Sequence, residues 1–187
     1  MGIILKTLAT LPMSVWTAYA IKLYWLLRFT GYRRNVIEQN LKRSFPSIND
    51  KELKKISNRF YRHLAQYFLE VLKMFAINPT FIKKRVKIQN QELIQRYYQE
   101  GKDVILVLGH YGNWEWGILG ISLNAKQKMM GVYKKLNNSF VNNLMNKNRG
   151  KFGADLVEMN DTYRYLVNTK EECKIIGLLA DQSPVKD

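Results

Sequence analysis

A short apolar run that ends at a glycine constrains the fold of this chain more than any other feature. Residues 104–108 read Val-Ile-Leu-Val-Leu, and Gly109 and His110 follow directly. An unbroken run of β-branched and aliphatic residues is typical of a strand in a parallel sheet, so we expect this one to be buried on both faces. Five residues after His110 comes Glu115, in a stretch rich in tryptophan. The sequence therefore predicts a reactive site at the C-terminal end of a buried strand.

Strands and helices alternate along the chain from about residue 80. This alternation predicts the α/β fold class, with a mainly parallel sheet flanked by helices. Because the sequence stops soon after its last predicted strand, we expect an α/β core, residues 80–187, that is incomplete at its C-terminus. The predicted strands are residues 86–89, 104–108, 129–133, 154–159 and 174–180, and the predicted helices are residues 91–99, 114–123, 139–152 and 162–168.

An apolar and aromatic segment, residues 1–30, comes first. Residues 7–21 are uncharged, but fifteen residues are fewer than the roughly 20 that span a bilayer. Extending the stretch to residue 27 gives twenty-one residues, which include one proline and one lysine. A cleavable signal peptide and a buried soluble helix remain as alternatives. We expect a membrane anchor or an interfacial helix, because the segment carries the interface-favouring residues Trp16, Tyr19, Tyr24 and Trp25.

A basic helical segment, residues 31–79, follows. The stretch 28–62 holds ten cations and three carboxylates, which suits an anionic membrane surface as well as a solvated helix face. Asn49 followed by Glu52 predicts a helix start with a capping box. Apolar residues at intervals of three and four then predict an amphipathic helix that ends near residue 76.

The charge balance limits the partners of the chain. Thirty Lys and Arg against fifteen Asp and Glu give its 187 residues a formal net charge of +15. Such a surface attracts polyanions, namely nucleic acid, anionic lipid head groups or an acidic partner protein. The single Cys173 excludes an intramolecular disulfide. With only His63 and His110 as further soft ligands, we expect no metal site.

His110 and Glu115 can meet only if the chain turns between them. Five residues along one continuous helix rotate the side chain by about 140° around the axis, so the two would face apart. Gly109 and Gly112 permit a turn, which would leave His110 at the strand end and Glu115 in the first turn of the next helix. A His held by a carboxylate is a general base. Because no Gly-x-Ser-x-Gly motif supplies a protein nucleophile, we expect His110 to activate a hydroxyl group of the substrate.

Four blocks of the sequence together resemble one enzyme family. Residues 109–117, Gly-His-Tyr-Gly-Asn-Trp-Glu-Trp-Gly, are similar to the His-x-x-x-x-Asp/Glu block of the late lipid A biosynthesis acyltransferases, within the wider lysophospholipid acyltransferase group. Residues 33–46, 133–153 and 178–182 resemble the segment after that family's N-terminal anchor, its second block and its Asp-Gln block. A Lys-Lys pair at 134–135 stands where many members carry Arg-Pro. We expect the family's C-terminal third, with a Phe-Phe-Gly type segment, to be missing.

The resemblance implies transfer of an acyl group from an acyl carrier protein or coenzyme A thioester to a hydroxyl of a lipid A precursor, without a further cofactor. It implies that His110 is the general base and that Glu115 orients it and stabilises its charged form. Arg149 is the candidate for binding phosphate or developing negative charge. Further candidates are Asn138, Asp181 and Gln182 for substrate binding, and Trp114, Trp116, Ile118 and Leu119 for the acyl pocket, although a structural cap explains Asp181, and core packing the last four, equally well.

The resemblance also implies a place and a set of partners. The place is the cytoplasmic face of the bacterial inner membrane. The partners are the acyl carrier protein, anionic membrane lipids and a phosphorylated glycolipid acceptor, with no nucleic acid. The net charge of +15 suits each of the three partners and identifies none of them by itself.

Two other kinds of function compete with this one. An acyltransferase that acts on a lysophospholipid or an aminolipid would use the same His and Glu. A basic nucleic-acid-binding protein or a membrane scaffold would also explain the net charge. For the nucleic-acid-binding protein, however, the sequence has no recognisable binding module, and the apolar N-terminal segment would be unexplained.

Overall fold

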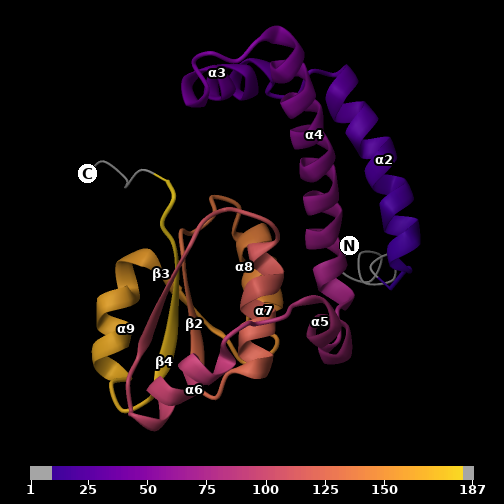
Figure 1. Cartoon of the computed structure of the whole chain (residues 1–187). Helices are drawn as coiled ribbons and strands as arrows, with labels where there is room; N and C mark the ends of the chain where they lie inside the picture. Colours follow the sequence, from indigo (N-terminus) through magenta and orange to yellow (C-terminus); the bar gives the residue numbers. More distant parts are fainter. Residues whose placement is uncertain (1–9, 183–187) are drawn as a thin grey trace. The chain divides into compact units, whose positions relative to one another are not determined.

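The computed structural model describes residues 10–182, which divide into two compact units at the Ala76–Ile77 boundary. The N-terminal unit is helical, and the C-terminal unit is α/β (Figure 1). The predicted segments 1–30 and 31–79 thus fall almost entirely in one unit, and the first nine residues of the signal-peptide alternative lie outside the described part.

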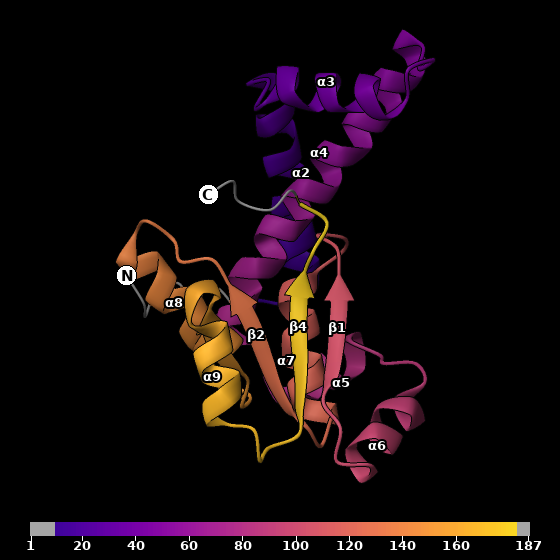
Figure 2. The ribbon, with the colours of Figure 1, turned by 90° about the vertical axis from the view of Figure 1, so that its left-hand side faces the viewer.

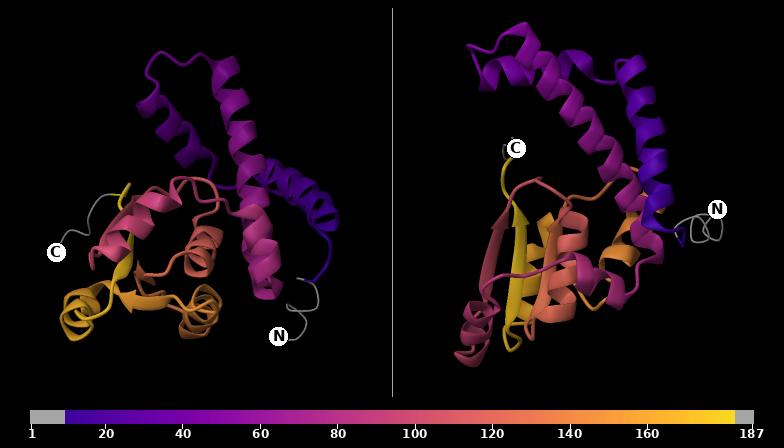
Figure 3. Two further views of the ribbon diagram at one scale, coloured as in Figure 1. Left: turned by 60° about the horizontal axis from the view of Figure 1, so that its bottom comes forward. Right: turned by 45° about the vertical axis from the view of Figure 1, so that its right-hand side comes forward.

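The N-terminal unit is a helical bundle built on one long helix. Helix α4 (Asp50–Lys73) begins at the predicted position, directly after Asn49. The Asn49 side chain accepts a hydrogen bond from the Glu52 backbone N–H at 2.9 Å and donates one to the Glu52 carboxylate at 3.0 Å, and this cap fixes the start of the helix. Helix α2 (Met13–Phe29) packs along α4, as Figures 1 and 3 show, and helix α3 (Arg34–Ser44) contacts it too. A short 3-10 turn, η1 (Met74–Ala76), follows α4. The core of the unit consists of Tyr24, Ile37, Tyr61 and Ala65, with Leu23, Leu27 and Leu41 packed against them.

Helix α2 buries one face and leaves its opposite face apolar as well. Trp16, Ala20 and Tyr24 are buried, at the four-residue spacing of a helix. None of the helices in the described part of the chain is both long enough and apolar enough to cross a membrane. The large apolar side chains that α2 exposes are Tyr19, Ile21, Trp25, Leu26 and Phe29.

The α/β unit contains a four-stranded parallel sheet among its described residues. Its strands are β1 (Val104–Leu108), β2 (Lys128–Tyr133), β3 (Asp155–Glu158) and β4 (Lys174–Leu179), in the order β1-β4-β2-β3 (Figure 2). This confirms the predicted α/β class and the parallel sheet. The helices are α5 (Pro79–Arg85), α6 (Gln91–Gln99), α7 (Trp114–Asn124), α8 (Ser139–Arg149) and α9 (Thr162–Asn168), with a 3-10 turn, η2 (Met159–Asp161), before α9.

Adjacent residues of the central strands face opposite layers, as the pleat of a strand requires. Met129 and Ile175 join Ile121 of α7 in one core cluster. Met130 and Ile176 join a second cluster, against which Tyr165 and Leu166 of α9 pack. Helices α7 and α8 therefore lie on one side of the sheet and α9 on the other (Figure 1).

Two strand predictions need correction. Residues 86–89 form no strand, and the sequence missed α5, which begins with Asn78 as N-cap and Pro79 at its first position. The expected burial of β1 on both faces is also wrong, since Ile105 and Val107 are each 64% exposed. The reason is position, because β1 is an edge strand and no helix within residues 10–182 covers that face of it. An apolar run thus identified the strand without identifying its neighbours.

Candidate active site

The ends of β1 and β4 bring two predicted site residues together. Strands β1 and β4 pair in parallel, with Leu108 opposite Leu179, and the Ala180 N–H donates to the Leu108 carbonyl at 2.9 Å. The residues that follow each strand therefore emerge side by side at the carboxyl edge of the sheet, where open α/β sheets bind their ligands. His110 leaves β1 and Asp181 leaves β4 at this edge.

His110 and Asp181 form two hydrogen bonds. The His110 backbone N–H donates to Asp181 Oδ2 at 2.7 Å, and the ring Nδ1 lies 2.6 Å from Asp181 Oδ1. Because a carboxylate only accepts, the proton on the ring sits on Nδ1 and leaves Nε2 as the acceptor of a neutral imidazole. The side chains are 31% and 44% exposed, so the pair is open to a substrate.

Both bonds act on the titration of Asp181. The hydrogen bond from the His110 ring, and then the one from the His110 backbone, hold the pKa of the Asp181 carboxyl below its ordinary value. Asp181 therefore stays ionised over the whole range in which a histidine can act as a base. A negative partner of this kind stabilises an imidazolium when the ring takes up a proton.

Close packing explains the glycine before His110. A Cβ atom on Gly109 would lie 3.3 Å from Asp181 Oδ2, inside the space that the His110–Asp181 bonds need. Gly112 has a φ of +65°, a conformation that other residues rarely adopt, and it makes the turn into α7. The predicted turn is thus present at Gly112, whereas Gly109 serves the approach of Asp181. The Trp114 ring meets the His110 ring edge-on, with their centroids 4.9 Å apart.

Glu115 lies in the first turn of α7 and is almost completely buried. The Asn113 side chain caps this helix by accepting from the Trp116 N–H at 3.0 Å. Arg149, the last residue of α8, donates from Nε to Glu115 Oε2 at 2.7 Å and from Nη2 to Oε1 at 2.5 Å. Only 4% of the Glu115 side chain and 20% of the Arg149 side chain is exposed. This two-bond geometry matches the planar guanidinium to the carboxylate.

The pairing differs from the one expected from sequence. We expected Glu115 to orient His110, but the ring nitrogen of His110 is bonded to Asp181 and both oxygens of Glu115 are bonded to Arg149. Sequence spacing pointed to the nearest carboxylate along the chain. The carboxylate that contacts His110 instead lies 71 residues away, because its strand is the neighbour of β1. The sequence does contain a sign that Asp181 belongs to the site, because Asp181 follows an apolar run just as His110 does.

Most of the remaining candidates fall into structural positions. Asn138 caps α8, its side chain accepting from the Val141 N–H at 3.0 Å. Trp116 is buried and meets Phe81 edge-on at 5.5 Å between ring centroids, Leu119 is fully buried, and Ile118 packs against the α7 core cluster. Gln182 is exposed. Within residues 10–182, no group of three or more His, Cys, Asp or Glu side chains gathers to hold a metal ion.

A strand-end histidine with an ionised carboxylate beside it, and a buried ion pair in the helix that follows, suit proton transfer to and from a substrate hydroxyl. A search of curated proteins gave no match for this chain. Among protein-family models, that of the bacterial lipid A biosynthesis acyltransferases matches residues 1–187, the whole chain. The chain therefore belongs to the bacterial lipid A biosynthesis acyltransferase family.

Proposed function

We propose that this acyltransferase moves a fatty acyl group from an acyl carrier protein thioester to a hydroxyl group of a lipid A precursor or a related glycolipid. Membership of the family supports an acyltransferase that acts on lipid A-like acceptors. The single observation that carries the chemistry is the His110 ring, held through Nδ1 by Asp181 at 2.6 Å with its Nε2 left as an acceptor.

In the proposed reaction, His110 Nε2 takes the proton of the acceptor hydroxyl while the oxygen attacks the thioester carbonyl. A tetrahedral intermediate forms, and its collapse breaks the carbon–sulfur bond. The departing thiolate then takes the proton from the imidazolium, so that an ester and a free thiol result. Asp181 keeps the ring in the required tautomer and stabilises the imidazolium. General-base help of this kind is worth roughly 10²–10⁴ in rate.

For Glu115 we propose a role that passes through Arg149. Both oxygens of its carboxylate are bonded to that guanidinium, so Glu115 fixes where the Arg149 charge sits. In the proposal, that charge faces either the negative charge that develops on the thioester carbonyl oxygen or the permanent charge of a phosphate on the acceptor. A direct bond from Glu115 to His110 in the substrate complex stays a prediction, as do the substrate contacts of Asn138 and Gln182 and the acyl-pocket role of Trp114, Trp116, Ile118 and Leu119.

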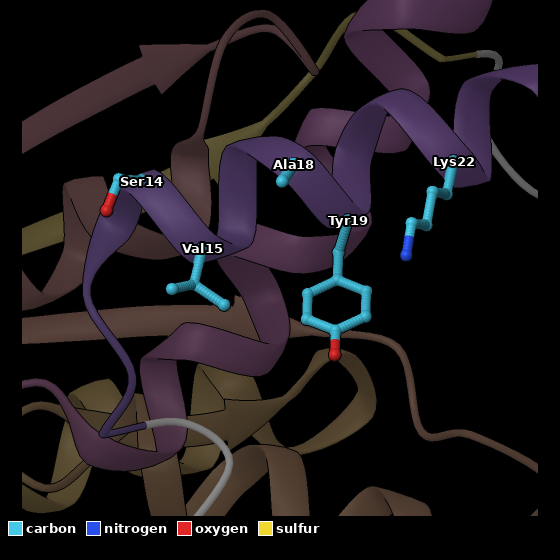
Figure 4. A pocket seen from close by; sticks show the side chains of 5 residues that line it. All are labelled: Ser14, Val15, Ala18, Tyr19 and Lys22. Atoms are coloured by element: carbon cyan, nitrogen blue, oxygen red, sulfur yellow. The ribbon is translucent and has the colours of Figure 1, made fainter.

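We propose that α2 lies in the membrane interface, at the cytoplasmic face of the bacterial inner membrane. Its exposed aromatic and aliphatic side chains support this placement. The Lys22 amine lies 5.5 Å from the centroid of the Tyr19 ring on the same helix, so a cation accompanies these apolar side chains. Figure 4 shows these two side chains with those of Ser14, Val15 and Ala18. The five residues line a hollow of about 400 Å³.

The decisive experiment is an acyl-transfer assay on the purified protein with carrier-protein thioesters and a lipid A precursor. His110→Ala should lower the rate at least about 100-fold, because the base is lost. The matched control is His63→Ala, which removes the other, exposed histidine on α4 and should leave the rate unchanged. Turnover of His110→Ala close to that of wild type would overturn the base assignment.

The same assay separates the competing functions. Coenzyme A thioesters test the donor, and lysophospholipid or aminolipid acceptors test the acceptor. A protein that transfers no acyl group to any of them, but binds RNA or DNA tightly in a salt-sensitive manner, would belong to the nucleic-acid-binding class instead.

A further inference from the structure

A basic pocket lies in the N-terminal unit, within the helices α2, α3 and α4. Its volume of about 450 Å³ is in the range of small-ligand sites. Buried Ile37, Leu53 and Tyr61 contribute apolar surface to its lining. Four cations line it as well, namely Arg28, Arg34, Lys42 and Lys54, together with the carboxylates Glu38 and Asp50. We call this the basic pocket.

The cations of the basic pocket are only partly neutralised. Arg34 pairs with Glu38, its Nε 2.7 Å from the carboxylate. The side-chain amines of Lys42 and Lys54 make no hydrogen bond or ion pair with any residue in the range 10–182. Positive charge therefore remains in excess within a concave space, where its field is focused.

One guanidinium is held in place without having its charge cancelled. The Nε of Arg28 donates to the amide oxygen of Asn58 at 2.7 Å, and Asn58 is neutral. The fixed orientation lowers the entropy that Arg28 would lose on binding an anion. Its charge also reaches the pocket lining, because Arg28 and Arg34 both oppose the rise that burial causes in the pKa of the Tyr61 hydroxyl.

A buried hydroxyl provides a second and independent observation. Ser57 lines the basic pocket, is 8% exposed, and its Oγ has no hydrogen-bond partner within the described part of the chain. Buried polar groups are nearly always bonded, so an unbonded hydroxyl in a pocket lining marks a place for an acceptor atom. The Ser57 hydroxyl and the cations of the basic pocket can therefore all donate hydrogen bonds to a ligand.

We propose that the basic pocket binds a phosphoryl group, with Arg28, Lys42 and Lys54 opposite its oxygens and Ser57 as a further donor. A phosphoryl group offers negative charge and at least three strong acceptor oxygens. One guanidinium and two ammonium groups can therefore each reach an oxygen, whereas a carboxylate ligand has only two oxygens to share among them. This site is separate from His110 and does not depend on the proposed acyl transfer. The phosphoryl group comes either from a soluble phosphate or from a lipid head group.

Binding to the purified full chain distinguishes the two sources. Isothermal titration with inorganic phosphate, at constant ionic strength, tests the soluble source. Sedimentation with vesicles of phosphatidylcholine alone, and of phosphatidylcholine mixed equally with phosphatidic acid, tests the head group. We expect Lys42→Glu and Lys54→Glu each to weaken binding about tenfold or more in one of the two assays, and Ser57→Ala to weaken it about threefold.

Neighbouring residues provide matched controls. Arg43→Glu on α3 and Lys55→Glu on α4 make the same change of charge at exposed positions that do not line the pocket, and should alter binding less than about twofold. Circular dichroism checks that each variant keeps its helices. Equal weakening by pocket and control variants would mean that diffuse surface charge binds the anion, and would overturn the proposal. Absence of binding in both assays would overturn it as well.

Discussion

The Glu115–Arg149 pair combines the strongest geometry with the least exposure of the ion pairs described in this chain. Removing one partner of such a pair leaves a buried charge without compensation. We therefore predict that Arg149→Met lowers the free energy of unfolding by about 3 kcal/mol, measured by urea denaturation. Glu115→Gln combined with Arg149→Met should recover part of that loss, because no bare charge then remains.

The control for this pair is an arginine at the surface. Arg164 lies 4.0 Å from Asp161, and its side chain is 81% exposed. Arg164→Met should change the free energy of unfolding by less than about 0.5 kcal/mol. Equal effects at Arg149 and Arg164 would show that the buried pair contributes no more than an exposed one.

The lowered pKa of the Lys151 amine predicts how the free energy of unfolding depends on pH. Burial lowers the pKa of its amine from 10.5 to about 8, although Nζ donates to the Ile77 carbonyl at 3.0 Å. Between pH 8 and pH 10.5 the unfolded chain therefore binds more protons at this position than the folded chain does. The free energy of unfolding must then rise with pH across this window, by about 1 kcal/mol once the partial exposure of the amine is discounted.

Replacing the lysine tests this sign. Lys151→Gln should remove the rise between pH 8 and pH 10.5, because no group at this position then titrates. Below pH 7 the curves of variant and wild type should run parallel, since the lysine is protonated in both states there. The opposite result would contradict the lowered pKa. In that case the free energy of unfolding of the wild type would fall between pH 8 and pH 10.5, and the fall would be absent in Lys151→Gln.

At the scale of elements, helix α7 depends on a glycine where it meets the segment after α5. A Cβ atom on Gly120 would lie 2.4 Å from Val86 Cγ1 and 2.8 Å from Val86 Cβ, closer than atoms can approach. We predict that Gly120→Ala destabilises the protein by about 1–3 kcal/mol through overpacking, measured by chemical denaturation. Gly120→Ala combined with Val86→Ala should lose less than the sum of the single variants.

The same helix carries its own control. A Cβ atom on Gly117 would meet nothing within 4 Å. Gly117→Ala should therefore stabilise the protein by about 0.5–1 kcal/mol, because alanine costs less entropy in a helix. If both substitutions shifted stability in the same direction and by the same amount, contact with Val86 would not be the cause.

The elements themselves were readable from sequence wherever local chemistry decides them. Apolar runs identified β1 and β4, the Asn49–Glu52 pair marked the start of α4, and apolar spacing traced that helix. Residues 86–89, which were predicted to form a strand, alternate apolar with polar side chains. Those apolar side chains pack against α7 from an irregular segment, as Val86 does against Gly120. Alternation over four residues reports burial of one side and cannot separate a strand from such a segment.

At the scale of the whole molecule, strand order was the part that sequence could not supply. The pattern predicts four of the described elements as strands of one parallel sheet, but nothing local shows that β4 lies between β1 and β2. Two features of the site region that differ from the expectation follow from this. The exposure of Ile105 and the pairing of His110 with Asp181 depend on which strand is an edge and which is its neighbour.

The place of β4 also decides when the sheet can form. Among the described strands, β1 pairs only with β4. Because β4 comes after β2 and β3 in the sequence, β1 stays unpaired while those two strands are synthesised. Contacts between residues this far apart in sequence form slowly, because a long loop must close before they are gained. Until then the apolar surface of β1 is open to other chains. A nascent chain therefore carries His110 without its carboxylate, and the site appears only when β4 enters the middle of the sheet.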